Sequence, residues 1–76
     1  MIYLHMEIES AVEVNDIIAQ IRNLNADVSD IQVRSPKSNI PGAVALMVVL
    51  DRLECTKEEM VQKINAIDHV LFVLAQ

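Results

Sequence analysis

The sequence predicts a small α+β domain, in which one antiparallel sheet carries two helices on one of its faces. Apolar residues alternate with a period of two in some segments and recur with the period of an α-helix in others. These segments follow the order strand, helix, strand, strand, helix, strand, which is a β-α-β unit used twice. With 76 residues the chain has room for one core, so we expect a single domain over residues 1–76.

The first half predicts a strand, a helix and a second strand. Residues 2–9 alternate strictly between apolar and polar side chains, as a half-buried strand does. From Val14 to Leu24 the apolar residues recur at helical spacing, which indicates an amphipathic helix. The sequence Asn-Ala-Asp at 25–27 ends this helix, and residues 28–34 have the composition of a second strand.

The second half predicts a strand, a helix and a last strand. Residues 35–42 form a loop, since they hold both prolines and the only glycine. The unbroken apolar run 43–50 indicates a strand with apolar side chains on both faces. Thr56 and Glu59 have the spacing of a capping box at the start of a helix. The apolar run 70–74 predicts the last strand.

Right-handed crossovers in both units place the helices on one face of a four-stranded antiparallel sheet with strand order 4-1-3-2. This is the ferredoxin-like βαββαβ sandwich. The third and fourth strands are apolar at both parities, so some apolar side chains must point away from the helices. A contiguous apolar patch of this kind usually marks an interface. We expect that face, or an edge of the sheet, to pack against a second copy in a homodimer or against another domain of the parent protein. The expected interface residues are Tyr3, His5, Ala45, Met47, Val49, Leu71 and Val73.

Composition excludes several classes of function. A net charge of −5 with six scattered Lys and Arg argues against nucleic-acid binding. The single cysteine, Cys55, rules out an internal disulfide and fits a reducing, cytoplasmic compartment. No apolar run reaches the roughly 20 residues that a membrane helix needs. Because strand-like sequence starts at Ile2, we expect a fragment of a longer protein, with membrane contact only through a transmembrane part of that parent.

Carboxylates near the first turn are the best candidates for a metal site. These are Glu7, Glu9, Glu13 and Asp16. Hard cations prefer carboxylate oxygens. Acidic residues on an exposed strand and at a helix start are also common without any metal. Since no spacing here fixes a coordination set, we expect no metal and no cofactor, with Glu7 and Glu9 as weak candidates.

The two histidines and the cysteine carry weaker signals. His5 and His69 are on neighbouring strands of the predicted sheet, where they could meet as a weak metal site or as a pH-sensitive contact. Cys55 precedes the Thr56 cap and fits a structural role. No nucleophile and base occur at a recognisable spacing, so we expect no enzymatic activity.

Two segments resemble the ACT domain, a ferredoxin-like regulatory module. The segment DIIAQIRNLNADVSDIQVRS looks like the family's first helix running into its second strand, and KEEMVQKINAIDHVLFVLAQ looks like its second helix and last strand. The resemblance implies regulation through domain association. It also implies an amino-acid or cation effector held between the turn before the first helix and the 28–34 strand of another subunit. The candidate ligand-binding residues are Ser10, Ala11, Val12, Glu13 and Asn15. Effector-binding members usually have a glycine in this turn; its absence here makes close backbone approach costly.

A narrower resemblance concerns the cytosolic C-terminal domain of MgtC/SapB-family bacterial membrane proteins, often called Mg²⁺ transporter-C. The chain is similar to that tail in its length, its missing turn glycine and its end at the last strand. This resemblance implies a non-catalytic regulatory or oligomerisation domain at the cytosolic face of the bacterial inner membrane, linked to magnesium homeostasis. The alternative is a small-molecule sensing ACT domain that regulates an attached enzyme or transcription factor.

Overall fold

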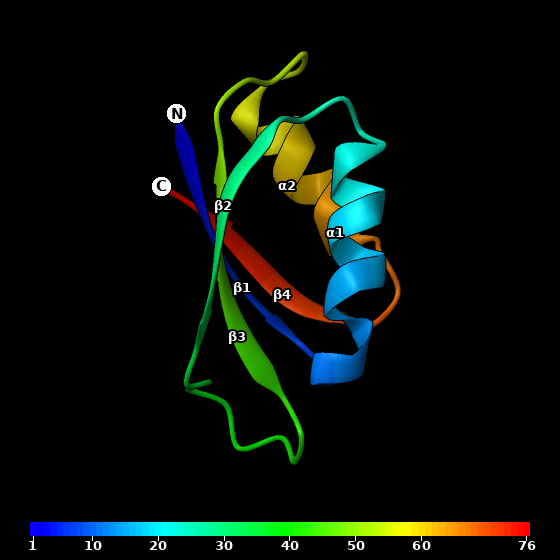
Figure 1. Cartoon of the computed structure of the whole chain (residues 1–76), viewed down its shortest axis with the longest axis vertical. Coiled ribbons are helices and arrows are strands. Elements are labelled where there is room, and N and C mark those ends of the chain that lie inside the picture. Colours follow the sequence, from blue (N-terminus) through cyan, green and yellow to red (C-terminus); the bar gives the residue numbers. More distant parts are fainter.

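Four antiparallel strands form one sheet, and two helices cover one of its faces (Figure 1). The computed structural model describes residues 1–76. In chain order the elements are β1 (Ile2–Ile8), the 3₁₀ helix η1 (Ala11–Glu13), α1 (Val14–Arg22), β2 (Val28–Arg34), β3 (Val44–Leu50), α2 (Lys57–Asn65) and β4 (Val70–Ala75). The sheet order β2-β3-β1-β4 is the predicted order 4-1-3-2 counted from the other edge. The ferredoxin-like α+β fold is confirmed.

Both helical segments begin at a side-chain cap that the sequence supplies. Ser10 Oγ accepts a hydrogen bond from the Val12 amide at 3.1 Å and starts η1, which leads directly into α1. Thr56 Oγ1 accepts from the Glu59 amide at 3.1 Å and starts α2. The first bond of the predicted capping box therefore forms. In its second bond the Glu59 carboxylate accepts from the Thr56 hydroxyl, also at 3.1 Å, and not from the Thr56 amide as in the usual motif.

The core lies between the sheet and the helices and is entirely aliphatic. Even-numbered residues of β1 and β3 face the helices, with Leu4 opposite Val48 and Met6 opposite Leu46. The two helices cover them with Ile17, Ile18, Ile21, Met60 and Ile64. A chain with one tyrosine and one phenylalanine must build its core this way. Neither helix has the length and apolar character needed to cross a membrane.

Each helix returns to the sheet through a residue in the left-handed region. Asn25 follows α1 with φ 63°, and His69 follows α2 with φ 75°. Asn and His occupy this region more often than most residues other than glycine. The two β-α-β units are therefore alike in backbone geometry, although their letters show no repeat.

Candidate functional site

The sheet face opposite the helices has no element over it (Figure 1). We call this surface the open face. Its side chains come from all four strands: Tyr3, His5, Glu7, Asp30, Gln32, Arg34, Ala45, Met47, Val49, Phe72 and Leu74. Tyr3, Phe72 and Leu74 are 41%, 39% and 61% exposed, so large apolar groups meet solvent here. The structure places Tyr3, His5, Ala45, Met47 and Val49 on this face; the apolar run 43–50 alone left the parity of the third strand open, and the role of these residues at an interface stays a prediction.

The fourth strand presents a different set of residues from the expected one. Val73 is only 6% exposed and belongs to the core, so it cannot line the open face. Phe72 and Leu74 take that position, paired with Glu7 and His5 of β1. Leu71 is half-buried beside a register shift, because Glu7 pairs with Phe72 whereas Ile8 pairs with Val70. The sequence missed this parity because the run 70–74 is apolar at every position.

A hollow of about 410 Å³ lies on the open face. Its lining combines apolar groups with polar ones: His5, Met6, Glu7, Arg34, Ser35, Lys37, Ala45, Leu46, Phe72, Leu74 and Gln76. Two of the six Lys and Arg of the chain are among them. His5 Nε2 lies 3.2 Å from Gln76 Oε1, so the histidine is engaged with the end of the chain.

Glu7 is the buried charged residue of the structure, with 4% of its surface exposed. Its carboxylate accepts hydrogen bonds from the Ser38 hydroxyl and from the Lys37 amide, the latter at 3.0 Å. The Ser38 hydrogen bond, followed by that from the Lys37 amide, lowers the pKa of Glu7 below its ordinary value. Both carboxylate oxygens therefore tie the β2–β3 loop to β1.

The four candidate acidic residues do not gather at one place. Glu7 points to the open face, and Asp16 accepts a hydrogen bond from Gln20 on α1 at 2.9 Å. Glu9 and Glu13 lie near His69 instead. No group of three or more His, Cys, Asp or Glu residues is placed to hold a metal ion.

His69 lies between two carboxylates at the start of β4. Its Nδ1 is 3.7 Å from Glu9 Oε2, and its Nε2 is 3.9 Å from Glu13 Oε2. Because the two contacts involve opposite ring nitrogens, one cation could not bridge all three groups. The expected approach of His5 to His69 does not occur, since His5 pairs with Leu74, five residues along β4 from His69 and about 16 Å away.

The turn between β1 and α1 uses its own backbone donors. The Val12 amide is bonded to the Ser10 side chain, and the Glu13 amide donates to the Ser10 carbonyl at 3.1 Å. The Val14 amide donates to the Ala11 carbonyl. The candidate ligand-binding residues Ser10 to Glu13 thus lie together with exposed Asn15 beside them, but most of the amides that would hold an effector are already paired.

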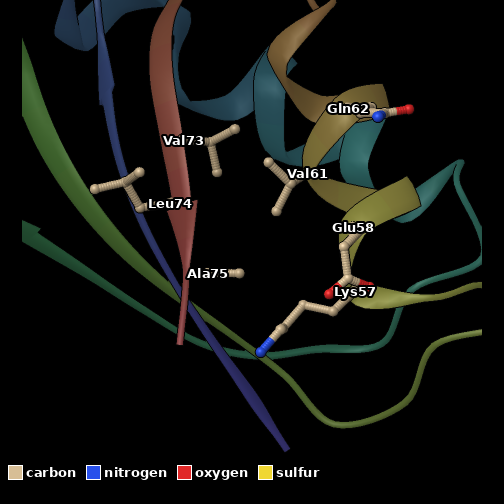
Figure 2. A pocket seen from close by; sticks show the side chains of 7 residues that line it. All are labelled: Lys57, Glu58, Val61, Gln62, Val73, Leu74 and Ala75. Carbon is tan, nitrogen blue, oxygen red and sulfur yellow. The ribbon is translucent and has the colours of Figure 1, made fainter.

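A second concave surface lies between β4 and α2 (Figure 2). Figure 2 shows Val61, Val73 and Ala75 directed into the space between strand and helix, and Leu74 directed to the other side of the strand. We call this surface the β4–α2 groove. It has a volume of about 350 Å³ and is lined by Lys57, Glu58, Val61, Gln62, Val73, Leu74 and Ala75. Cys55, which precedes the helix, is half-buried against the core.

The chain matches no model of a known protein family, and no curated protein matches it.

Proposed function

We propose that the chain is a non-catalytic, ACT-like regulatory domain that acts by association with a second copy or with another domain of its parent protein. The observation that carries this proposal is the open face. Phe72, Leu74 and Tyr3 are exposed on a sheet that has helices on one side only. Covering these groups would remove apolar surface from water, which favours association.

The size of this effect sets the expected affinity. Full burial of a Leu or Phe side chain is worth about 1.5–3 kcal/mol. Phe72 and Leu74 are only partly exposed, and association itself costs several kcal/mol. We therefore expect a dissociation constant in the micromolar range or weaker, which suits a domain that is held close to its partner within a larger protein.

The pairing of the polar groups supports a non-catalytic role. The Glu7 carboxylate holds the β2–β3 loop, His69 lies between Glu9 and Glu13, and His5 contacts Gln76. In each case a titratable side chain is used in a contact within the fold. Regulation by such a domain would be mechanical, because a shift between paired domains biases the module attached to them.

The resemblance to MgtC/SapB tails supports a narrower form of the proposal. In that form the chain is the cytosolic C-terminal domain of a bacterial inner-membrane protein linked to magnesium homeostasis. The sequence of the full-length gene product tests it. Several apolar helices preceding residue 1 would support it, whereas an upstream soluble enzyme domain would contradict it.

A specific observation favours the alternative, a small-molecule sensor. The hollow on the open face has Arg34, Lys37 and His5 in its lining, which suits the carboxylate of an amino acid. A thermal-shift screen with the amino acids and divalent cations tests this alternative, because a ligand that binds only the folded state raises its melting temperature. A clear rise with one ligand would favour sensing over simple association.

Light scattering and sedimentation equilibrium test association itself. Met47→Asp places a charge in the centre of the open face, and Asn23→Asp places the same charge at the exposed end of α1 as a matched control. We expect the unchanged chain and the control to self-associate at high micromolar concentration and Met47→Asp to associate more weakly. If the unsubstituted chain stayed monomeric at high micromolar concentration, self-association would be contradicted.

A further inference from the structure

The outer edge of β4 carries backbone groups that no strand covers. β4 is the last strand of the sheet and pairs only with β1. Tyr3 and Gln76 exchange two hydrogen bonds, of 3.3 and 2.9 Å. Bonded and non-bonded pairs alternate along an antiparallel ladder, so Leu74 also bonds to β1, whereas Val73 and Ala75 do not. The N–H and C=O groups of Val73 and Ala75 therefore point out from the sheet.

The two edges of the sheet differ in how they are protected. β2, at the opposite edge, contains Asp30 and Arg34 and has a register shift between Val28 and Asp30. Charged side chains and irregular pairing are the usual means by which an edge strand is kept from pairing with another chain. β4 has the sequence VLFVLA, with no charge and no proline. The register shift of β4 lies at its Val70 end, so the part of its edge from Phe72 to Ala75 is regular and the less protected of the two edges.

The β4–α2 groove lies beside this open edge. Side chains of Val73 and Ala75 point to the helix side of the sheet, where Val61 of α2 forms the opposite wall (Figure 2). A strand added next to β4 would place alternate side chains in this groove and the others beside Phe72 and Leu74 on the open face. Backbone bonds and apolar contacts would therefore form together.

We propose that β4 of one copy pairs with β4 of a second copy, antiparallel and about a two-fold axis, which joins the two sheets into one sheet of eight strands. Such an isologous contact satisfies the outward groups of Val73 and Ala75 in both copies at once. It also continues the apolar strip of Phe72 and Leu74 from one copy to the next. The inference rests on the proposed function, since it requires self-association, and it adds the β4 edge to the open face as a surface for a second copy.

Charge favours a second copy at this edge over other surfaces of the molecule. The chain carries a net charge of −5, so two copies repel each other in general. β4 itself is uncharged, and the lining of the groove includes one cation, Lys57, and one anion, Glu58. By contrast, the end of the sheet near His69 holds Glu9 and Glu13. The β4 edge is therefore a place where two acidic copies can meet with little repulsion.

The contact has the dimensions that a small interface needs. Six strand residues span about 20 Å, and α2 runs beside them for about 14 Å. Small specific interfaces bury about 600 Å² on each partner. That area is about an eighth of the 4642 Å² surface of one copy. To reach this area, the contact would use the strand edge, the groove and the adjoining apolar strip together.

Ala75→Pro tests the pairing with little effect on the fold. The Ala75 N–H points away from β1, so proline removes a donor that only a second copy would use, and edge strands accept proline at such positions. Ala75→Ser keeps the N–H and is the matched control. Sedimentation equilibrium should show the dimer dissociation constant raised about tenfold or more in Ala75→Pro, because each copy loses one hydrogen bond, and unchanged in Ala75→Ser.

Amide hydrogen exchange of the unsubstituted chain gives a second readout that needs no variant. The Val73 and Ala75 amides should exchange fast in dilute solution and slowly at high concentration, whereas the Leu74 amide should be protected at both. A dimer that survives Ala75→Pro but is lost in Met47→Asp would overturn the edge pairing and leave association through the open face standing. A chain that is monomeric at every concentration would overturn both proposals.

Discussion

The parity of β4 can be tested by comparing two neighbouring residues, Val73 and Leu74. Val73→Ala removes two carbon groups from a side chain that is 6% exposed. At about 0.8 kcal/mol for each group the transfer loss is about 1.6 kcal/mol, and the cavity left behind raises the total to about 2 kcal/mol. Leu74→Ala removes three groups from a side chain that is 61% exposed, so only about two-fifths of a loss of about 2.4 kcal/mol applies. The expected cost of that substitution is about 1 kcal/mol.

Urea unfolding at low protein concentration measures both values under conditions where self-association does not contribute. In a domain of this size, 1 kcal/mol corresponds to about 4–8 °C in melting temperature, so thermal melts should separate the two variants by several degrees. The slope of unfolding free energy against urea should stay constant, because neither substitution changes the surface exposed on unfolding. If Leu74→Ala cost as much as Val73→Ala in the monomer, the placement of Val73 in the core would be refuted.

Three further predictions concern a buried carboxylate, a helix cap and a glycine. Glu7→Gln should lower the melting temperature at neutral pH, because the amide is a weaker acceptor for Ser38 and Lys37. The folded-state pKa of Glu7 is lowered, so the stability that its carboxylate contributes is present above the ordinary pKa of 4.5 and is lost as pH falls through the folded-state pKa. The melting temperatures of Glu7→Gln and of the unsubstituted chain should therefore converge as pH falls. Curves that stay parallel would contradict this role of Glu7. Thr56→Ala should cost about 1 kcal/mol in urea unfolding and Thr56→Ser much less, since serine keeps the acceptor for the Glu59 amide; equal losses would exclude the cap as the cause. Gly42→Ala should cost about 1–2 kcal/mol of stability because of the positive φ of 83°, and not because of a clash, since an added Cβ would meet only the Glu9 carbonyl oxygen at an ordinary 3.6 Å. Gly42→Asn should cost less, because asparagine tolerates this conformation, and calorimetry can rank the two variants.

The element order could be predicted from the sequence because its apolar period changes at definite residues. The alternation in residues 2–9 and the helical spacing from Val14 correspond to β1 and α1, and Thr56 marks the start of α2. These signals are local, since each depends on residues within one or two turns. The parity of β1 was also open to prediction, because its polar residues all point to one side.

The features that sequence reasoning missed depend on contacts between distant residues. The parity of β4 is set by its pairing with β1 across a register shift, and no letter in an all-apolar run indicates it. The role of Glu7 depends on Lys37 and Ser38, which lie 30 and 31 residues further along the chain. The candidate carboxylates look like one cluster in the sequence, but strand geometry sends Glu7 to one face and places Glu9 at the end of the sheet.

The two hydrogen bonds between Tyr3 and Gln76 determine how the domain would respond to tension. They join β1 and β4 near the two ends of the chain, which lie close together (Figure 1). A pull applied between these ends acts along the direction of the ladder bonds, so it opens them one after another from the Gln76 end instead of shearing them all at once. The first event under load would be the peeling of β4 from the sheet, which removes the very strand that carries the open edge. If β4 pairs with a second copy as proposed, that contact would be lost at the same step.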